Sequence, residues 1–185
     1  MVAQPRLVTV DEFEQFLALP ENADRLFELI DGEIVEKMPT QVHGIVAGNI
    51  ITWLNMYFLN HPIGLAAVEA RHRPSADDQH NDRLPDVSVV LDLTKPVTRQ
   101  GAAPFLPDIC IEIKSPDDTY KEMADTAAFY LANGAKLVWL VYPEQKLVEA
   151  LTNDTRELIG ETGMITAGEL LPEFSAPVSG FFRGV

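Results

Sequence analysis

Two stretches of the sequence carry charged side chains where a buried strand would carry only apolar ones. Residues 84–90 read Leu-Pro-Asp-Val-Ser-Val-Val and contain Asp86. Residues 107–116 read Pro-Asp-Ile-Cys-Ile-Glu-Ile-Lys-Ser-Pro and contain Glu112 and Lys114. Burying an unpaired charge costs much free energy, so these side chains must pair with other groups or line a cleft.

The alternation of side chains along a strand divides the second stretch into two faces. Ile109, Ile111 and Ile113 share one face, which we expect to be core, whereas Glu112 and Lys114 share the other. The sequence therefore predicts a carboxylate and an ammonium on one face at the end of a strand, just before a Ser-Pro break.

A neighbouring strand that brought Asp86 to the same place would complete a set of two carboxylates, a strand carbonyl and a lysine. Carboxylate and carbonyl oxygens are the hard ligands that Mg²⁺ and Mn²⁺ take in proteins. A nearby lysine stabilises the charge that develops on a phosphate, so the set is suited to hydrolysing phosphodiester bonds. A simpler alternative stays open: Glu112 and Lys114 can form an ion pair on a solvated sheet face, and Asp86 can end a turn after Pro85.

The elements that would position these residues follow from periodicity and end signals. Thr9 and Glu12 form a possible capping box for a short helix that Pro20 stops. Asp31-Gly32 lies between two alternating apolar runs, which predicts a β-hairpin. We expect this helix and hairpin to fill residues 9–40.

The rest of the chain alternates between helices and strands. The expected elements are a long helix over 42–59, strands over 65–73, 84–93 and 108–114, a helix from Thr119 to Asn133-Gly134, and strands over 136–142 and 146–151. Strand, helix and strand across 108–142 imply a parallel crossover, and the strands from 65 to 114 imply antiparallel pairs. The predicted fold class is α/β, a mixed sheet flanked by helices, in one domain over residues 1–185 with a core at 42–152 and an irregular docking tail at 153–185.

The residues of the two charged stretches match a known motif. Pro85-Asp86, followed by Glu112-Ile113-Lys114, is similar to the PD-(D/E)XK pattern of restriction-endonuclease-like nucleases. Roughly residues 9–175 resemble one largely uncharacterised bacterial family of that superfamily. The stretches that carry the resemblance are residues 27–33, His43, residues 85–87, 111–116, 130–134 and 137–143.

The resemblance implies a restriction-endonuclease-like core and a divalent-metal-dependent endodeoxyribonuclease that hydrolyses DNA. It implies a Mg²⁺ or Mn²⁺ site at Asp86 and Glu112, to which the backbone carbonyl of Ile113 adds a ligand. Lys114 corresponds to the catalytic lysine. The alternative is a non-catalytic module on the same fold that binds protein or nucleic acid.

Three further residues are candidates for accessory roles. Glu28, in the predicted hairpin, resembles an additional acid that relatives place near the cleft, although an edge strand can also carry an inward acid as a guard against aggregation. His43 precedes the long helix, where a histidine more often caps or packs. Ser88 shares a strand face with Asp86, and Cys110 is interpreted as a small buried hydrophobe.

Charge sets limits on how the chain could bind a nucleic acid. Lys and Arg number 14 and Asp and Glu number 28, so the formal net charge is −14. Arg71, Arg73 and Arg83 are candidates for phosphate contacts, but three aspartates in the same stretch offset them. Binding through bulk charge is therefore excluded, and any nucleic-acid contact must come from a site.

Composition also bounds location and partners. No uninterrupted apolar run approaches the ~20 residues of a membrane span, so we expect no membrane contact. A single cysteine and an N-terminal stretch without an apolar run favour the cytoplasm. No phosphate-binding Gly-rich loop is present, so we expect no nucleotide cofactor. A homodimer could form through Phe181-Phe182, although these residues could equally cover the protein's own core.

Overall fold

The computed structural model describes residues 6–185, which form two compact units built from separated stretches of the chain. The first unit comprises the described part of Met1–Met38 together with Arg71–Leu84 and Val97–Phe105. The second comprises Pro39–Ala70, Pro85–Pro96 and Leu106–Val185. The predicted single domain over residues 1–185 stays a prediction.

The second unit is built on a six-stranded sheet in the order β3-β4-β5-β6-β7-β8. Strands β5 and β6 pair in parallel and every other neighbouring pair is antiparallel, so the predicted mixed sheet is confirmed. The bounds are β3 (Leu65–Val68), β4 (Val87–Val90), β5 (Ile109–Ile113), β6 (Leu137–Tyr142), β7 (Leu147–Leu151) and β8 (Arg156–Gly160).

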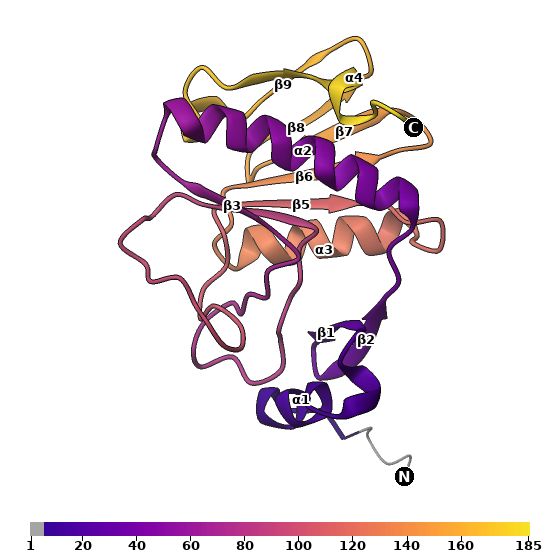
Figure 1. Cartoon of the computed structure of the whole chain (residues 1–185), viewed down its shortest axis with the longest axis vertical. Helices are drawn as coiled ribbons and strands as arrows, with labels where there is room; N and C mark the ends of the chain where they lie inside the picture. Colours follow the sequence, from indigo (N-terminus) through magenta and orange to yellow (C-terminus); the bar gives the residue numbers. More distant parts are fainter. Residues whose placement is uncertain (1–5) are drawn as a thin grey trace. The chain divides into compact units, whose positions relative to one another are not determined.

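Two long helices cover opposite faces of this sheet (Figure 1). Helix α2 (Gln41–Asn60) packs on the face that carries Ile109, Ile111 and Ile113, as the strand alternation predicted. Helix α3 (Tyr120–Ala132) packs on the face that carries Cys110, and its N-terminus has a complete capping box between Thr119 and Glu122. Because α3 connects β5 to β6, it makes the crossover that parallel pairing requires.

Helix α2 differs from the expectation that no segment approaches the length and apolar character of a membrane span. It is the one helix, within residues 6–185, that is long and apolar enough to cross a membrane by length and composition alone. Polar residues interrupt its apolar runs, which is why counting uninterrupted runs missed it. The buried side chains Val46, Ile50 and Leu54 pack in the larger core of the sheet, as those of a core helix do.

The tail over residues 153–185 is more regular than predicted. Strand β8 joins the sheet, β9 (Met164–Thr166) pairs with β10 (Ser175–Pro177), and a short helix α4 (Val178–Phe181) follows. Short elements with only one or two inward side chains leave a weak periodic signal, which explains the error. Phe181 and Phe182 are buried in the protein's own core, so they cannot form the dimer contact.

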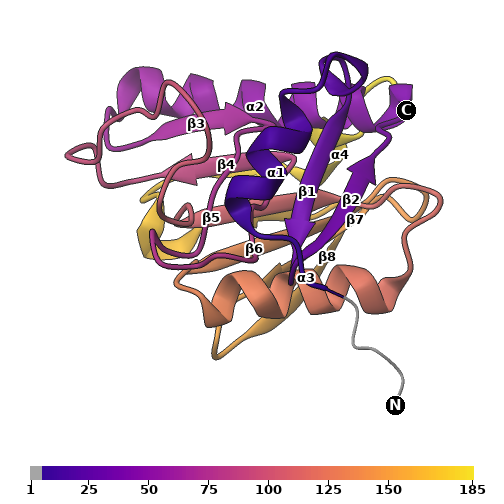
Figure 2. The same cartoon turned by 90° about the horizontal axis from the view of Figure 1, so that it is seen from below.

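The first unit contains α1 (Val10–Leu17), a 3₁₀ turn η1 (Pro20–Asn22) and a hairpin of β1 (Leu26–Ile30) and β2 (Glu33–Lys37). Figure 2 shows α1 lying along the hairpin. Their core consists of Val10, Phe13, Phe27 and Leu29. The predicted capping box and the Asp31-Gly32 turn are both present, and both turn residues have positive φ, as the tight turn of a hairpin requires.

Candidate active site

Asp86 connects the two charged stretches directly. It stands immediately before β4, is only 2% exposed, and its Oδ2 accepts a hydrogen bond of 2.7 Å from the backbone N–H of Ile113. Ile113 lies between Glu112 and Lys114. The structure therefore brings the Pro-Asp and Glu-Ile-Lys segments together at one end of the sheet, on neighbouring strands.

His43 provides a second donor to the same carboxylate. Its Nε2 lies 2.9 Å from Oδ2 of Asp86, and both side chains are buried. An ionised carboxylate only accepts, so this distance requires the proton to be on Nε2. His43 lies in the first turn of α2 and not before the helix as expected, and Thr40 caps the helix by accepting a hydrogen bond from the backbone N–H of His43. Helix α2 thereby places the ring. Two donors on one oxygen hold the carboxylate of Asp86 in one orientation.

Glu112 is held from the opposite face of the sheet. It is 7% exposed, and its Oε1 accepts a hydrogen bond of 2.7 Å from the hydroxyl of Tyr130 on α3. Tyr130 itself is fully buried. A buried tyrosine hydroxyl needs a polar partner, and here that partner is a candidate metal ligand. Each of the two carboxylates is thus oriented by a side chain from a different helix.

Lys114 is the less buried member of the set. It follows β5, and its backbone N–H donates to the carbonyl of Val141. This hydrogen bond extends the parallel pairing of β5 with β6 by one residue. Its Nζ donates to the carbonyl of Ser115 at 2.9 Å and lies 5.7 Å from the ring centroid of Tyr120. The ammonium therefore lies just beyond the end of the strand, beside Tyr120.

Ser88 and Cys110 lie deeper in the sheet. They are buried and directly opposite each other in the β4–β5 register. Burial raises the pKa of the Cys110 thiol well above its ordinary value, and the nearby charges of Glu112 and Asp108 raise this pKa further. A thiol in that environment stays protonated and unreactive, which agrees with its interpretation as a small hydrophobe.

The carboxylates at this end of the sheet have the chemistry of a magnesium site. Within residues 6–185, no three His, Cys, Asp or Glu side chains gather closely enough to hold a metal by themselves. Mg²⁺ usually takes only one or two carboxylates from a protein and fills its remaining positions with waters and substrate phosphates. Asp86 and Glu112 supply that share, so the donor set fits a hard divalent cation.

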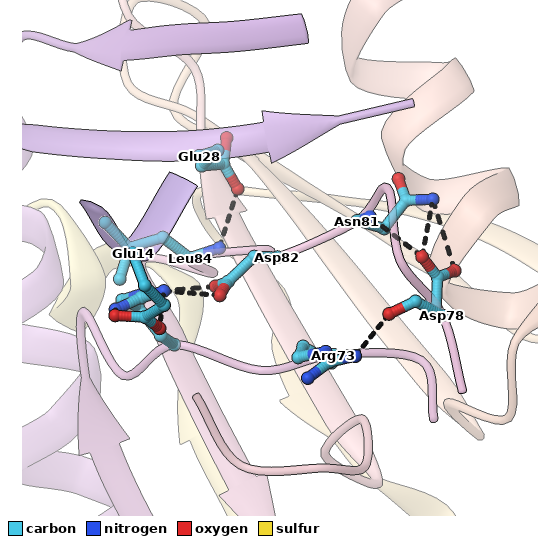
Figure 3. A network of polar contacts seen from close by, with 8 residues as sticks. Glu14, Glu28, Arg73, Asp78, Asn81, Asp82 and Leu84 are labelled. Atoms are coloured by element: carbon cyan, nitrogen blue, oxygen red, sulfur yellow. Dashed lines mark hydrogen bonds and ion pairs between the residues drawn. The ribbon is translucent and has the colours of Figure 1, made fainter. Parts of the chain in front are cut away.

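Glu28 lies in the first unit, where it binds backbone. Its Oε1 accepts a hydrogen bond of 2.7 Å from the N–H of Leu84 (Figure 3). The carbonyl of Leu84 accepts a hydrogen bond of 2.9 Å from Nζ of Lys37. One strand of the hairpin thus satisfies the N–H of Leu84 and the other satisfies its C=O. This contact explains why β1 carries a buried acid.

The three candidate arginines also belong to the first unit. Arg71 forms a two-pronged pair with Asp82, at 3.1 and 2.5 Å, and it also reaches Glu14. Arg73 donates to the carbonyls of Ala76 and Asp78, and Arg83 is buried. Figure 3 shows Arg73 and Asp78 in this network. These contacts hold the loops of the unit together, and a role in binding phosphate stays a prediction.

Comparison with known proteins decides the family. Residues 13–179 match the model of the Uma2 family, described as "Putative restriction endonuclease". The chain belongs to the Uma2 family. No curated protein matches the chain.

A solved relative agrees with the fold. The crystal structure of a putative nuclease from Anabaena variabilis superposes on this Uma2 chain with a TM-score of 0.76 at 25% sequence identity. The match covers 95% of this chain and 98% of the other. The restriction-endonuclease-like fold and the family predicted from the sequence are therefore confirmed.

Two tyrosines of this Uma2 chain were missed as site residues. Tyr130 was predicted only as a residue of the helix that ends at Asn133-Gly134 and of the stretch 130–134 that carries the resemblance, because its contact with Glu112 depends on how α3 packs on the sheet. Tyr120 was predicted only as a residue of the same helix, and it is 58% exposed and lies beside Lys114. It is the first residue of α3, so the helical periodicity of later turns does not determine its contacts.

Proposed function

We propose that the chain is an endodeoxyribonuclease that depends on Mg²⁺ or Mn²⁺ and hydrolyses DNA phosphodiester bonds. The observation that carries this proposal is the 2.7 Å hydrogen bond from Ile113 to Asp86, which joins the two halves of the motif. Membership of the Uma2 family supports it at the level of a nuclease.

The proposal gives each residue a separate task. Asp86, Glu112 and the carbonyl of Ile113 would hold the cation. When bound, the cation would polarise the scissile phosphate and offset its negative charge. Lys114 would hold the attacking water by a hydrogen bond and stabilise the charge that develops on the phosphate.

His43 and Tyr130 act on the carboxylates and not on the substrate. The hydrogen bonds from His43 to Asp86 and from Tyr130 to Glu112 fix the orientation of the two carboxylates before any cation arrives. Groups that orient metal ligands in this way contribute to metal affinity. We assign both as positioning residues of the proposed site.

A second candidate function is a non-catalytic module on the same fold. The net charge of −14 favours it, because a DNA-binding surface usually neutralises phosphates with clustered Lys and Arg. The retention of Asp86, Glu112 and Lys114 together, at one end of the sheet, favours the enzyme.

Location and assembly form part of the proposal. We place the protein in the cytoplasm, where the free, buried thiol of Cys110 stays reduced. A homodimer would let two sites address both strands of a duplex. Such a dimer must use a surface other than Phe181 and Phe182, because their side chains are buried in the core.

The deciding experiment is DNA cleavage by four proteins in Mn²⁺ and in Mg²⁺. Supercoiled plasmid is incubated with wild type, Glu112→Gln, Lys114→Ala and Glu149→Gln. Glu149 is a matched control, because it is also a buried carboxylate that accepts a tyrosine hydroxyl, here from Tyr142 at 3.1 Å. We expect wild type and Glu149→Gln to cut and Glu112→Gln to cut at least ~100-fold more slowly.

The outcomes separate the two functions. Cleavage that persists in Glu112→Gln and in Lys114→Ala would contradict the assigned site. A folded wild type that neither cuts DNA nor binds Mn²⁺ would favour the non-catalytic module. Circular dichroism of each variant identifies any loss that comes from unfolding.

A further inference from the structure

An exposed aromatic ring stands beside the lysine of the proposed site. Tyr120 is 58% exposed, and its ring centroid lies 5.7 Å from Nζ of Lys114. On another side it meets the buried Tyr142, with centroids 5.6 Å apart and planes tilted by 36°. One side of the ring therefore packs against a buried side chain, while much of its surface faces solvent.

The ring of Tyr120 is not part of the buried core beneath α3. The buried residues of α3 are Met123, Ala127 and Tyr130, and Tyr120 lies outside that core. The face of the ring that these contacts leave exposed is therefore open to a partner bound beside Lys114. Such a partner must offer an apolar face beside the position proposed for the phosphate.

The charges around the ring determine what that partner is. Asp117 and Asp118 precede Tyr120 and Glu122 follows it within a few residues, and Lys121 pairs with Asp125 at 2.5 Å. This acidic surrounding does not attract a phosphate backbone through Lys or Arg contacts. The face of a nucleobase carries no charge and stacks on tyrosine, so it suits this position.

We propose that Tyr120 stacks on an unpaired base beside the scissile phosphate, so that the substrate is single-stranded or branched DNA. In an intact duplex the base faces are covered by neighbouring bases, and the ring would have nothing to stack on. This inference rests on the proposed function, because it names the substrate class of the same site. Stacking also lets a strongly acidic protein hold DNA with few ionic contacts.

The test measures stacking and cleavage separately. A short single strand, a matched duplex and a forked duplex each carry 2-aminopurine, a base analogue whose fluorescence falls when it stacks. Each DNA is titrated in Mn²⁺ with wild type, Tyr120→Phe, Tyr120→Ala and Leu158→Ala, and initial cleavage rates are measured in parallel. Leu158 is a control, because it is an equally exposed apolar side chain on β8.

We expect wild type, Tyr120→Phe and Leu158→Ala to quench the single strand and the fork and to cut both faster than the duplex. Tyr120→Ala should lose the quenching and bind the single strand about 5- to 100-fold more weakly. Binding by wild type should change little with salt, because few phosphate contacts contribute.

Other results would overturn the inference. If Tyr120→Ala quenches like wild type, or slows cutting of all three DNAs equally without a change in quenching, the ring only shields Lys114. If wild type cuts the duplex as fast as the single strand, the substrate class is wrong while the proposed function stands. A wild type that neither binds nor cuts any of the three DNAs overturns the proposed function as well.

Discussion

At the scale of single residues, the two candidate metal ligands are oriented by different means. Asp86 receives a backbone N–H and the Nε2 of His43 on one oxygen, whereas Glu112 receives the hydroxyl of Tyr130. Donors to a carboxylate stabilise its charged form, which a cation needs. Removing one donor should therefore weaken metal binding more than it weakens the fold.

Tyr130→Phe tests whether loss of one donor to a carboxylate weakens metal binding. The change removes only the hydroxyl that donates to Glu112, and the ring keeps its place in the core. We expect Mn²⁺ affinity to fall by about 10- to 100-fold, as isothermal titration calorimetry would measure. Tyr142→Phe, which removes the hydroxyl that donates to Glu149, serves as the control. Equal Mn²⁺ affinity in all three proteins would show that Tyr130 has no positioning role.

Cys110 provides a test that depends on pH. Burial raises the pKa of its thiol, so the unfolded chain loses this proton at a lower pH than the folded chain does. The contribution of the thiol to stability is therefore present near neutral pH and declines as the pH rises past the ordinary thiol value. Iodoacetamide at pH 8.5 should label the native protein very slowly and the denatured protein fully. Rapid labelling of the native protein would mean that the site opens readily.

At the scale of elements, α3 depends on its first turn. Thr119 accepts a hydrogen bond from the N–H of Glu122, and Glu122 accepts one in return from the N–H of Thr119. Thr119→Ala should cost about 1 kcal/mol, which corresponds to a fall of roughly 2–4 °C in melting temperature for a chain of this size. Differential scanning calorimetry measures it. Thr119→Ser should keep nearly all of the stability, and a Ser variant as unstable as the Ala variant would exclude the cap as the cause.

Elements with strong local signals were predicted well. The capping boxes at Thr9 and Thr119 and the Asp31-Gly32 turn act within a few residues, so the sequence reveals them. Strand β8 depends on pairing with β7, and the loops of the first unit depend on pairs such as Arg71 with Asp82. Such contacts join distant positions, and no local pattern marks them.

The candidate site likewise combines features that local patterns predicted with contacts between distant positions that they did not. The alternation along β5 correctly separated the isoleucine face from the face of Cys110. The partners of the carboxylates were missed or left open, because Tyr130 and His43 come from helices whose rotation is decided by packing. Predicting that Tyr130 donates to Glu112 would have required knowing which turn of α3 passes over β5.

At the scale of the whole molecule, net charge and cation binding are linked. A chain with a charge of −14 gains from each bound divalent cation some relief from its own repulsion. Cation binding at a site that exists only in the folded state also stabilises that state. The effect can be measured without any DNA.

Mn²⁺ should therefore raise the melting temperature. At a free concentration of about 100 times Kd, the added stability is ~2.7 kcal/mol, or roughly 5–10 °C. Asp86→Asn should abolish the shift, and an excess of EDTA should reverse it in wild type. Asp108→Asn is the control, because Asp108 also precedes a strand and accepts a backbone N–H, from Leu91 at 2.8 Å. An equal shift in wild type and Asp86→Asn would place the cation elsewhere.

The first unit is drawn from three separated stretches of the chain, and this has a consequence for synthesis. On the ribosome, α1 and the hairpin emerge first, but Arg71–Leu84 follows only after α2 and β3 have been made, and Val97–Phe105 only after β4 as well. The nascent N-terminal segment must wait unfinished, with the apolar side chains of Phe13 and Leu29 only partly covered. A product released before residue 71 would lack the segment that supplies Arg71 over Phe13 and Asp82 beside Leu29, and it would be a ready target for chaperones and proteases.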